Sequence, residues 1–301
     1  MPSSCTAVSY GQSLPPESLT LIRTLLAGNG ATVLAESRTH HPGFDAVTFS
    51  LEVAGEEAHD AVSRLRAALA DAPLANMETA VVPDSLHRAA RKFIIMDVDS
   101  TLIQQEVIEL LAAHAGKEAE VAQVTEAAMR GELDFAESLH HRVATLAGLP
   151  ESVLADVGTK IRLSVGAERL VAQAKAAGHC VAAVSGGFSQ ILAPLAARLG
   201  LDFSLANDLE IVAGHLTGKV SGDVVDRATK ARVLRKWSAE AGIEMCATMA
   251  IGDGANDLDM MAAAALGVAF NAKPAVQVAA DARINLPNLD VALALAGIRA
   301  S

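Results

Sequence analysis

Cysteine is scarce in this chain, with three residues among 301: Cys5, Cys180 and Cys246. They are widely spaced, form no Cys-x-x-Cys pair and are odd in number, so the sequence offers no disulfide framework. Disulfide bonds are rare in reducing compartments. We therefore expect no disulfide bond and a cytoplasmic location.

Long apolar runs are absent as well. No window approaches about 18 uninterrupted apolar residues, and the first residues do not form a basic region followed by an apolar stretch. A membrane-spanning helix requires such a window, and a secretory signal requires those two regions in that order. The sequence thus predicts neither a membrane span nor export.

Basic residues are outnumbered, because 24 lysines and arginines face 35 aspartates and glutamates, for a net charge of -11. Nucleic acids and anionic membranes are themselves negative, so neither is expected as a general partner. No GxxxxGK[ST] segment occurs, so a nucleotide-binding P-loop has no support. Hydrophobic residues make up 51% of the chain, which is enough for the cores of two or three domains.

The first 84 residues have the pattern of a small α+β domain. Apolar and polar residues alternate over residues 47–53, as in a strand with one buried face, and helical spacing of apolar residues precedes and follows it. The expected elements are strands near 6–10, 31–36, 47–53 and 76–82 and helices over 19–28 and 58–69. Their order, βαββαβ, is that of a ferredoxin-like unit, and it resembles an ACT-type regulatory domain.

A different architecture is expected from residue 85 to residue 301. Residues 83–92 are interpreted as a linker, and beyond them apolar strands, notably 180–184 and 247–251, alternate with helical patterns. Each strand is followed by a glycine-containing turn and a helix, which predicts a doubly wound α/β fold with a mostly parallel sheet. Residues 105–165 contain helical patterns without a convincing strand, which indicates a helical cap inserted over the sheet edge.

The segment with the clearest chemical content is 93–101, Phe-Ile-Ile-Met-Asp-Val-Asp-Ser-Thr. Four consecutive large apolar residues are typical of a strand buried on both faces, and α/β folds place their chemistry at the carboxyl ends of such strands. Asp97 is therefore expected at an active-site edge, with Asp99 beside it. Two carboxylates held this close need a neutralising cation, or one of them keeps its proton near neutral pH.

Two further turns follow apolar strands. Ser185-Gly186-Gly187 offers a hydroxyl and backbone N–H groups before a helix, which is typical of an anion cradle, although an ordinary strand-to-helix turn explains the pattern equally well. The sequence GDGAND at 252–257 adds carboxylates at another strand end, and acidic oxygens from two strand ends suit Mg²⁺. Lys230 lies on an expected helix and, taken alone, is an ordinary surface lysine.

Together these segments resemble the four motifs of the haloacid dehalogenase superfamily of phosphatases, in the order DVDST at 97–101, Ser185-Gly186, Lys230 and GDGAND at 252–257. The resemblance implies that Asp97 attacks phosphorus to form an aspartyl phosphate, while Asp99 protonates the leaving oxygen and later deprotonates the hydrolytic water. It also implies Mg²⁺ held by Asp97, the backbone carbonyl of Asp99 and Asp253. The phosphate oxygens would be held by Ser185, Gly186 and Lys230, with Asn256 and Asp257 in support.

Within the superfamily, the sequence is most similar to the phosphoserine phosphatase family, through Glu106, Met129, Phe135 and Arg142. The similarity implies that Arg142 binds the substrate carboxylate, that Glu106 binds the ammonium, and that Met129 and Phe135 form an apolar wall. One departure is His140, at a position where the family often has an arginine; the nearby Arg142 is retained. The implied reaction is Mg²⁺-dependent hydrolysis of O-phospho-L-serine, the last step of serine biosynthesis.

Two other functions stay open at this point. Another small-molecule phosphatase of the superfamily would differ mainly in the cap, and phosphate release from a panel of phosphomonoesters separates the two. An amino-acid-sensing protein with an inactive phosphatase fold is disfavoured, because every candidate catalytic side chain is present. The ACT-like unit adds the expectations of an amino acid effector and of a homodimer.

Overall fold

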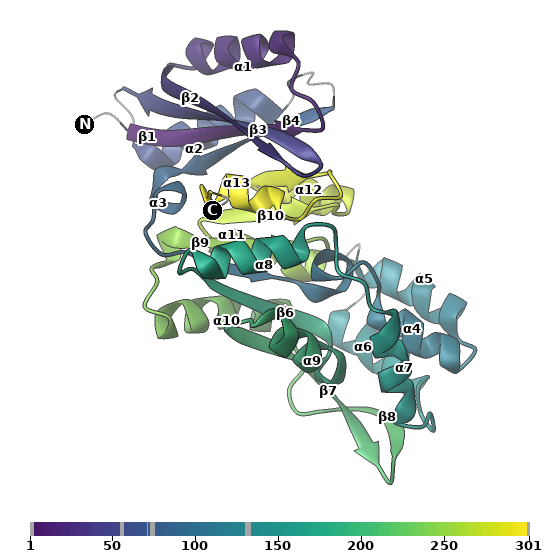
Figure 1. Ribbon diagram of the computed structural model, residues 1–301. Helices are drawn as coiled ribbons and strands as arrows, with labels where there is room; N and C mark the ends of the chain where they lie inside the picture. Colours follow the sequence, from purple (N-terminus) through teal and green to yellow (C-terminus); the bar gives the residue numbers. More distant parts are fainter. Residues whose placement is uncertain (1–2, 55–56, 71, 73–75, 130–133, 300–301) are drawn as a thin grey trace.

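The computed structural model describes residues 3–54, 57–70, 72, 76–129 and 134–299, and the side chains of Met129 and Phe135 lie outside this description. The described chain forms a four-stranded antiparallel sheet near the N-terminus and a larger seven-stranded sheet (Figure 1). Every helix in this part falls short of the length and hydrophobicity that a membrane span requires. All three cysteines are free.

The N-terminal unit has the expected βαββαβ order and a ferredoxin-like sheet, with strand order β2-β3-β1-β4. Its longest strand, β2, extends beyond the expected 31–36 because it pairs with β3 as far as the His41–Phe44 position. Residues 36–40 of β2 are exposed and therefore lack the apolar pattern that marks a strand in sequence. The elements are β1 (Ser3–Gly11), α1 (Pro16–Gly28), β2 (Ala31–His41), β3 (Phe44–Val53), α2 (Ala58–Ala70) and β4 (Met77–Pro83).

Both faces of this small sheet are buried in part. Phe49 and Leu51 on one face pack with Ile22 of α1 and Leu65 of α2. On the other face Tyr10 and its neighbours join the apolar core of the larger unit. In Figure 1 the C-terminal segment, in yellow, lies directly beneath the small sheet. The two units therefore share a packed interface.

The segment 83–92, interpreted as a linker, is ordered in part. A short helix, α3 (Asp84–His87), follows β4 immediately. Leu86 is fully buried, and the Nδ1 of His87 lies 3.0 Å from the carbonyl oxygen of Leu295. The connection is thus packed against the C-terminal part of the chain and differs from the simple linker that its polar composition indicated.

The second unit is the expected doubly wound α/β fold. The strand order is β11-β10-β9-β5-β6-β7-β8, and all neighbouring strands are parallel except the β7–β8 hairpin. The strands are β5 (Phe93–Met96), β6 (Cys180–Phe188), β7 (Phe203–Val212), β8 (His215–Ser221), β9 (Thr248–Gly252), β10 (Leu266–Phe270) and β11 (Ala282–Ile284).

Helices cover both faces of the larger sheet, which explains the unbroken apolar run before Asp97. Ile94 and Met96 of β5 pack in one core with α8 (Ala167–Ala176), α9 (Ser189–Leu199) and α13 (Val291–Leu295). Phe93 and Ile95 point to the opposite core, with α10 (Arg227–Glu240), α11 (Leu258–Ala263) and α12 (Pro274–Ala279). A strand buried on both faces has no polar alternation.

The expected helical cap is present between β5 and α8. It consists of α4 (Val107–His114), α5 (Glu118–Met129), α6 (Phe135–Ala144) and α7 (Ser152–Lys160). An antiparallel bridge between Ile103 and Leu163 joins its two connections, and the N–H of Gln104 donates to the carbonyl of Arg162 at 2.9 Å. The cap is thereby attached to the edge of the sheet where β5 ends.

Candidate active site

Three adjacent strands of the larger sheet bring the sequence motifs together. β5 lies between β6 and β9, and all three run in the same direction. Asp97 follows β5, Ser185 lies near the end of β6, and Asp253 follows β9. The N–H of Asp97 still donates to the carbonyl of Ile251 at 2.9 Å, which fixes the register at this edge. The carboxyl ends of parallel strands meet at one edge, as the sequence predicts.

Beyond Asp97 the chain makes one tight turn, η1 (Val98–Leu102), which contains Asp99. Ser100 in this turn has a φ of 56°, which is uncommon for a residue other than glycine. Its hydroxyl donates to Glu106 Oε1 at 2.6 Å. The carboxylate of Asp99 accepts from the N–H of Val107 at 2.8 Å and from Ser185 Oγ at 3.1 Å. The turn therefore fixes Asp99 and Glu106 as well as Asp97.

Three carboxylates form a group of the size that holds a metal ion. Oxygens of Asp97, Asp253 and Asp257 all lie within 4.8 Å of one another, and all three residues are buried. The hydroxyl of Thr101 lies 3.4 Å from Asp253 Oδ1. Asp257 belongs to this group, although the sequence analysis did not assign it to the metal. The carboxylate of Asp99 is directed to Ser185 instead. From Asp99 the sequence analysis assigned only the backbone carbonyl to the metal. A set of hard oxygen donors fits a divalent cation such as Mg²⁺.

Lys230 is completely buried beside this group. Its Nζ donates to Asp97 Oδ1 and to Asp257 Oδ1, the latter at 2.7 Å. The helix that carries it, α10, begins at a side-chain cap in which Asp226 accepts from the N–H of Thr229 at 2.7 Å. The match of Lys230 to one of the four motifs predicted that it lies in the active site. Taken alone, a lysine is expected at the surface.

Negative charge exceeds positive charge in the site. Burial raises the pKa of Asp97 well above its usual value, with Asp257 and Asp99 adding to the effect and Lys230 opposing it. Burial and the charge of Glu106 raise the pKa of Asp99 to about 7, and burial raises that of Glu106 to about 7. Burial also raises the pKa of Asp253. Lys230 and Arg142 are fewer than these carboxyl groups, so the site fits an additional cation.

The Ser185-Gly186-Gly187 segment is held close to Asp99. The N–H of Gly187 donates to Ser185 Oγ at 2.7 Å, and a Cβ at position 187 would lie 2.5 Å from Asp99 Oδ2. Because any side chain at position 187 would clash with the Asp99 carboxylate, glycine is required there. Asn207 of β7 donates to the carbonyl of Gly186 at 2.8 Å and accepts from the N–H of Val225 at 2.8 Å. Sequence reasoning missed Asn207, because nothing near it in the chain marks it as a partner of this turn.

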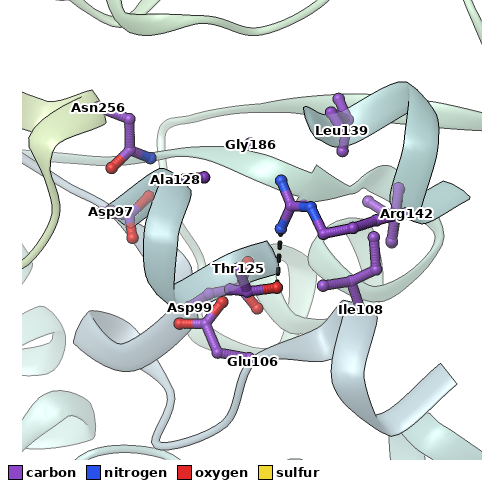
Figure 2. Close-up of a pocket in the computed structure, with 12 residues that line it drawn as sticks. Asp97, Asp99, Glu106, Ile108, Thr125, Ala128, Leu139, Arg142, Gly186 and Asn256 are labelled. Carbon is purple, nitrogen blue, oxygen red and sulfur yellow. Dashed lines mark hydrogen bonds between the residues drawn. The ribbon is translucent and has the colours of Figure 1, made fainter. Parts of the chain in front are cut away.

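The cap contributes a buried arginine to the same pocket. Arg142 of α6 donates from Nη1 to the hydroxyl of Thr125 at 3.0 Å (Figure 2). Its Nε donates to the carbonyl of Ser138 at 3.1 Å. Thr125, on α5, was not predicted. The pocket brings Glu106 and Arg142 together with groups from the sheet edge, and its lining includes Asp97, Asp99, Gly186 and Asn256.

The apolar wall of the pocket comes from residues that the sequence did not single out. Ile108, Ala128, Leu139 and Phe188 line it. The expected contributors, Met129 and Phe135, end α5 and begin α6, and their side chains lie outside the described residues. One buried polar atom in the pocket, Oδ1 of Asn256, has no hydrogen-bond partner among the described residues. An unpaired buried acceptor of this kind is consistent with a site for a ligand.

Comparison with known proteins agrees with this geometry. The model of the haloacid dehalogenase-like hydrolase family matches residues 94–262. A phosphoserine phosphatase of Streptomyces coelicolor is 52% identical over 289 residues, 96% of this chain and 69% of the relative. A Mycobacterium tuberculosis phosphoserine phosphatase is 52% identical over 223 residues, 74% of this chain and 54% of the relative.

Two solved structures are also similar to this chain. One is a phospho-aspartyl intermediate analogue of a phosphoserine phosphatase, 40% identical, with a TM-score of 0.66 over 68% of this chain and 98% of that one. The other is a substrate-bound phosphoserine phosphatase complex, 39% identical, with a TM-score of 0.66 over 68% and 97%. This chain belongs to the haloacid dehalogenase-like hydrolases and, among them, to the phosphoserine phosphatase family.

Proposed function

We propose that this protein hydrolyses O-phospho-L-serine to L-serine and phosphate through a phosphorylated Asp97. The observation that carries the proposal is one pocket that combines Asp97 and Asp99 with Glu106 and Arg142. Phosphoserine has a phosphate for the first pair and an ammonium and a carboxylate for the second. The names of the two relatives support the same activity.

In the proposed reaction Asp97 attacks phosphorus while the bond from phosphorus to the serine oxygen breaks. Asp99, whose pKa is raised to about 7, gives a proton to that oxygen as it leaves. A water molecule then attacks the phosphorus of the aspartyl phosphate while Asp99 accepts its proton, and the bond from phosphorus to the Asp97 oxygen breaks, which releases phosphate and restores the Asp97 carboxylate. The hydrogen bonds from Val107 and Ser185 hold Asp99 in one orientation for both steps.

The remaining polar groups are assigned to the phosphate and to a metal ion. Ser185, Gly186 and Lys230 are proposed to hold the phosphate oxygens, with Asn256 and Asp257 in support. Asp97 and Asp253, with the backbone carbonyl of Asp99, are proposed to hold Mg²⁺. When bound, the metal reduces the repulsion between the Asp97 carboxylate and the phosphate dianion.

Arg142 and Glu106 are assigned to the amino acid end of the substrate. Arg142 is 5% exposed, and its Nε and Nη1 are fixed by Ser138 and Thr125. Its remaining donors are proposed to bind the substrate carboxylate, and Glu106 the ammonium. Met129 and Phe135 are proposed to complete the apolar wall.

The N-terminal unit is proposed to be a regulatory or dimerisation domain. We place the boundary near residue 84, with the phosphatase domain over 85–301 and the cap over about 105–165. An amino acid effector and a homodimer are the proposed partners, and the enzyme is proposed to act in the cytoplasm as the last step of serine biosynthesis. Residues of both units belong to one apolar core, so an effector bound to the N-terminal unit is expected to influence the phosphatase domain as well.

A panel of phosphomonoesters, assayed with and without Mg²⁺, tests the proposed activity. We expect phosphoserine to have the highest specificity constant and Mg²⁺ to be required. A carboxylate-free ester hydrolysed as efficiently as phosphoserine would favour a different small-molecule phosphatase of the family. Equal activity in excess chelator would contradict the metal assignment.

A further inference from the structure

Arg142 is fixed by two hydrogen bonds that come from different helices of the cap. Its Nε donates to the carbonyl of Ser138, one turn back on its own helix α6. Its Nη1 donates to the hydroxyl of Thr125 on α5, and the dashed line in Figure 2 marks this bond. A guanidinium is planar and rigid, so two fixed N–H groups also set the direction of its other donors. That direction therefore depends on α5 as well as on α6.

The hydroxyl of Thr125 is itself oriented by its own helix. Its Oγ1 donates to the carbonyl of Val121 at 2.9 Å, and the residue is 3% exposed. A hydroxyl has a single proton, so a hydroxyl that donates to Val121 can only accept from Arg142. A valine at position 125 would fill nearly the same volume without offering an acceptor. The hydroxyl, rather than the bulk of the side chain, is thus what holds the guanidinium.

Helix α5 is attached to the edge of the sheet that carries the carboxylate group. Glu126 of α5 lies 2.8 Å from Nζ of Lys273 as an ion pair. Lys273 immediately precedes α12, and its N–H donates to the carbonyl of Asp253 at 3.1 Å. The same helix packs against η3 (Ala255–Asp257). The distance between the phosphate end of the pocket and the Arg142 guanidinium is therefore set through α5.

We propose that Thr125 is a positioning residue that sets the length of the substrate, by holding Arg142 at the distance from Asp97 that phosphoserine spans. The inference rests on the proposed function, because it takes Arg142 as the group that binds the substrate carboxylate. One added methylene lengthens an amino acid phosphoester by roughly 1.5 Å. A guanidinium held at Nε and Nη1 does not follow this shift, so it pairs well with the carboxylate of only one homologue.

Loss of the Thr125 hydroxyl should relax this selection without removing the charge that attracts a carboxylate. In Thr125→Val, Arg142 keeps its bond to Ser138 and gains freedom to turn about it. A hydrogen bond to a charged group contributes enough that its loss weakens an interaction by about tenfold or more. We expect the KM for phosphoserine to rise by about this factor, with kcat changed less than about threefold. A longer homologue should lose less, because it never fitted the fixed guanidinium.

Steady-state kinetics of the full chain with Mg²⁺ on three esters tests the proposal. The esters are O-phospho-L-serine, O-phospho-L-homoserine, which is one methylene longer, and O-phosphoethanolamine, which lacks the carboxylate. Thr125→Val should lower the ratio of the phosphoserine and phosphohomoserine specificity constants by about fivefold or more and leave phosphoethanolamine nearly unchanged. Thr125→Ser, which retains the hydroxyl, should keep the ratio of the unaltered chain. Thr159→Val is the matched control, because the Thr159 hydroxyl also donates to a backbone carbonyl but is exposed on α7.

A double variant distinguishes positioning from simple support of the cap. In an Arg142→Ala background no guanidinium remains to be oriented, so Thr125→Val should change none of the three specificity constants further. A further loss in that background, an unchanged ratio in Thr125→Val, or equal losses on phosphoserine and phosphoethanolamine would overturn the proposal. An unaltered chain that hydrolyses phosphoethanolamine as efficiently as phosphoserine would contradict the proposed function and this inference with it. A clear preference for phosphoserine that Thr125→Val leaves intact would contradict this inference alone.

Discussion

Lys230 donates hydrogen bonds to both Asp97 and Asp257, and all three side chains are buried. The lysine thereby joins helix α10 to the end of β5 and to the turn that follows β9. Burial alone would lower the pKa of Lys230, but Asp257 and Asp97 raise it, so the ammonium stays charged. The site is therefore held together by one buried ammonium that donates to two carboxyl groups, and its geometry depends on all three.

Replacing this lysine should affect both stability and activity. Removal of one partner from a buried ion pair costs about 3–5 kcal/mol, because the remaining charge is left uncompensated. Lys230→Met should lower the free energy of unfolding of the metal-free protein by about this amount at pH 7, and hydrolysis should fall at least about 100-fold through loss of a phosphate contact. Urea unfolding and phosphate release measure the two effects. Lys236→Met, on an exposed position of the same helix, should be neutral; equal behaviour of the two variants would contradict this account.

The dependence of stability on pH should differ with and without metal. Carboxyl groups in the unfolded chain lose their protons near pH 4, whereas burial raises the pKa of Asp99 and Glu106 to about 7 and raises those of Asp97 and Asp253 as well. The contribution of these four groups to the stability of the metal-free protein is thus fully present below about pH 4 and is lost as pH rises through the folded pKa values.

Mg²⁺ should reverse this loss, because it binds the deprotonated carboxylates. The increase in melting temperature on adding Mg²⁺ is expected to be larger at pH 8 than at pH 6. Thermal unfolding at the two pH values measures it, with Asp253→Asn as a variant in which the increase should shrink. An increase that is equal or smaller at pH 8 is the opposite of what these pKa shifts require.

Asp99→Asn should distinguish leaving groups. An amide donates no proton to the serine oxygen, so hydrolysis of phosphoserine should fall by about 100-fold or more. The first step with p-nitrophenyl phosphate should suffer less, because p-nitrophenolate leaves without a proton. Burst-phase kinetics with both esters measure that step. Equal losses on the two esters would argue against Asp99 as the general acid.

Arg142→Ala should weaken recognition of the substrate carboxylate. Loss of a charge-assisted contact in a closed pocket costs about 2–4 kcal/mol, or roughly 30- to 1,000-fold in the specificity constant for phosphoserine. Carboxylate-free esters should change little, and this comparison controls for misfolding because a damaged fold slows both substrates. Arg162→Ala, at an exposed position beside the cap, is the matched control. A common loss factor for both ester types would remove the carboxylate assignment.

Local sequence patterns predicted those parts of the site that lie directly at strand ends. Asp97, Ser185 and Asp253 follow or end apolar strands, and parallel strands bring their carboxyl ends to one edge whatever their distance in sequence. Asn207 and Thr125 were missed because each acts on a residue that lies in another element, Gly186 and Arg142. Such partners depend on tertiary packing and leave no mark on their own neighbours in the chain.

The same limit applies to elements whose residues are not buried in a regular pattern. The exposed part of β2 is a strand because β3 pairs with it. Helix α3 forms in a polar segment because its Leu86 side chain is buried against the rest of the protein. The burial of Lys230 likewise depends on Asp97 and Asp257, which are far from it in sequence. In each case the deciding interaction is long-range.

Trapping the phosphorylated enzyme tests the central claim most directly. The unaltered chain, mixed with phosphoserine and Mg²⁺ and quenched in acid during turnover, is digested, and the phosphorylated peptide is identified by mass spectrometry. We expect one phosphate on the peptide that contains Asp97, and neither phosphorylation nor turnover in Asp97→Asn of unchanged fold. A phosphate on another residue, or phosphate release by Asp97→Asn near the rate of the unaltered chain, would contradict it.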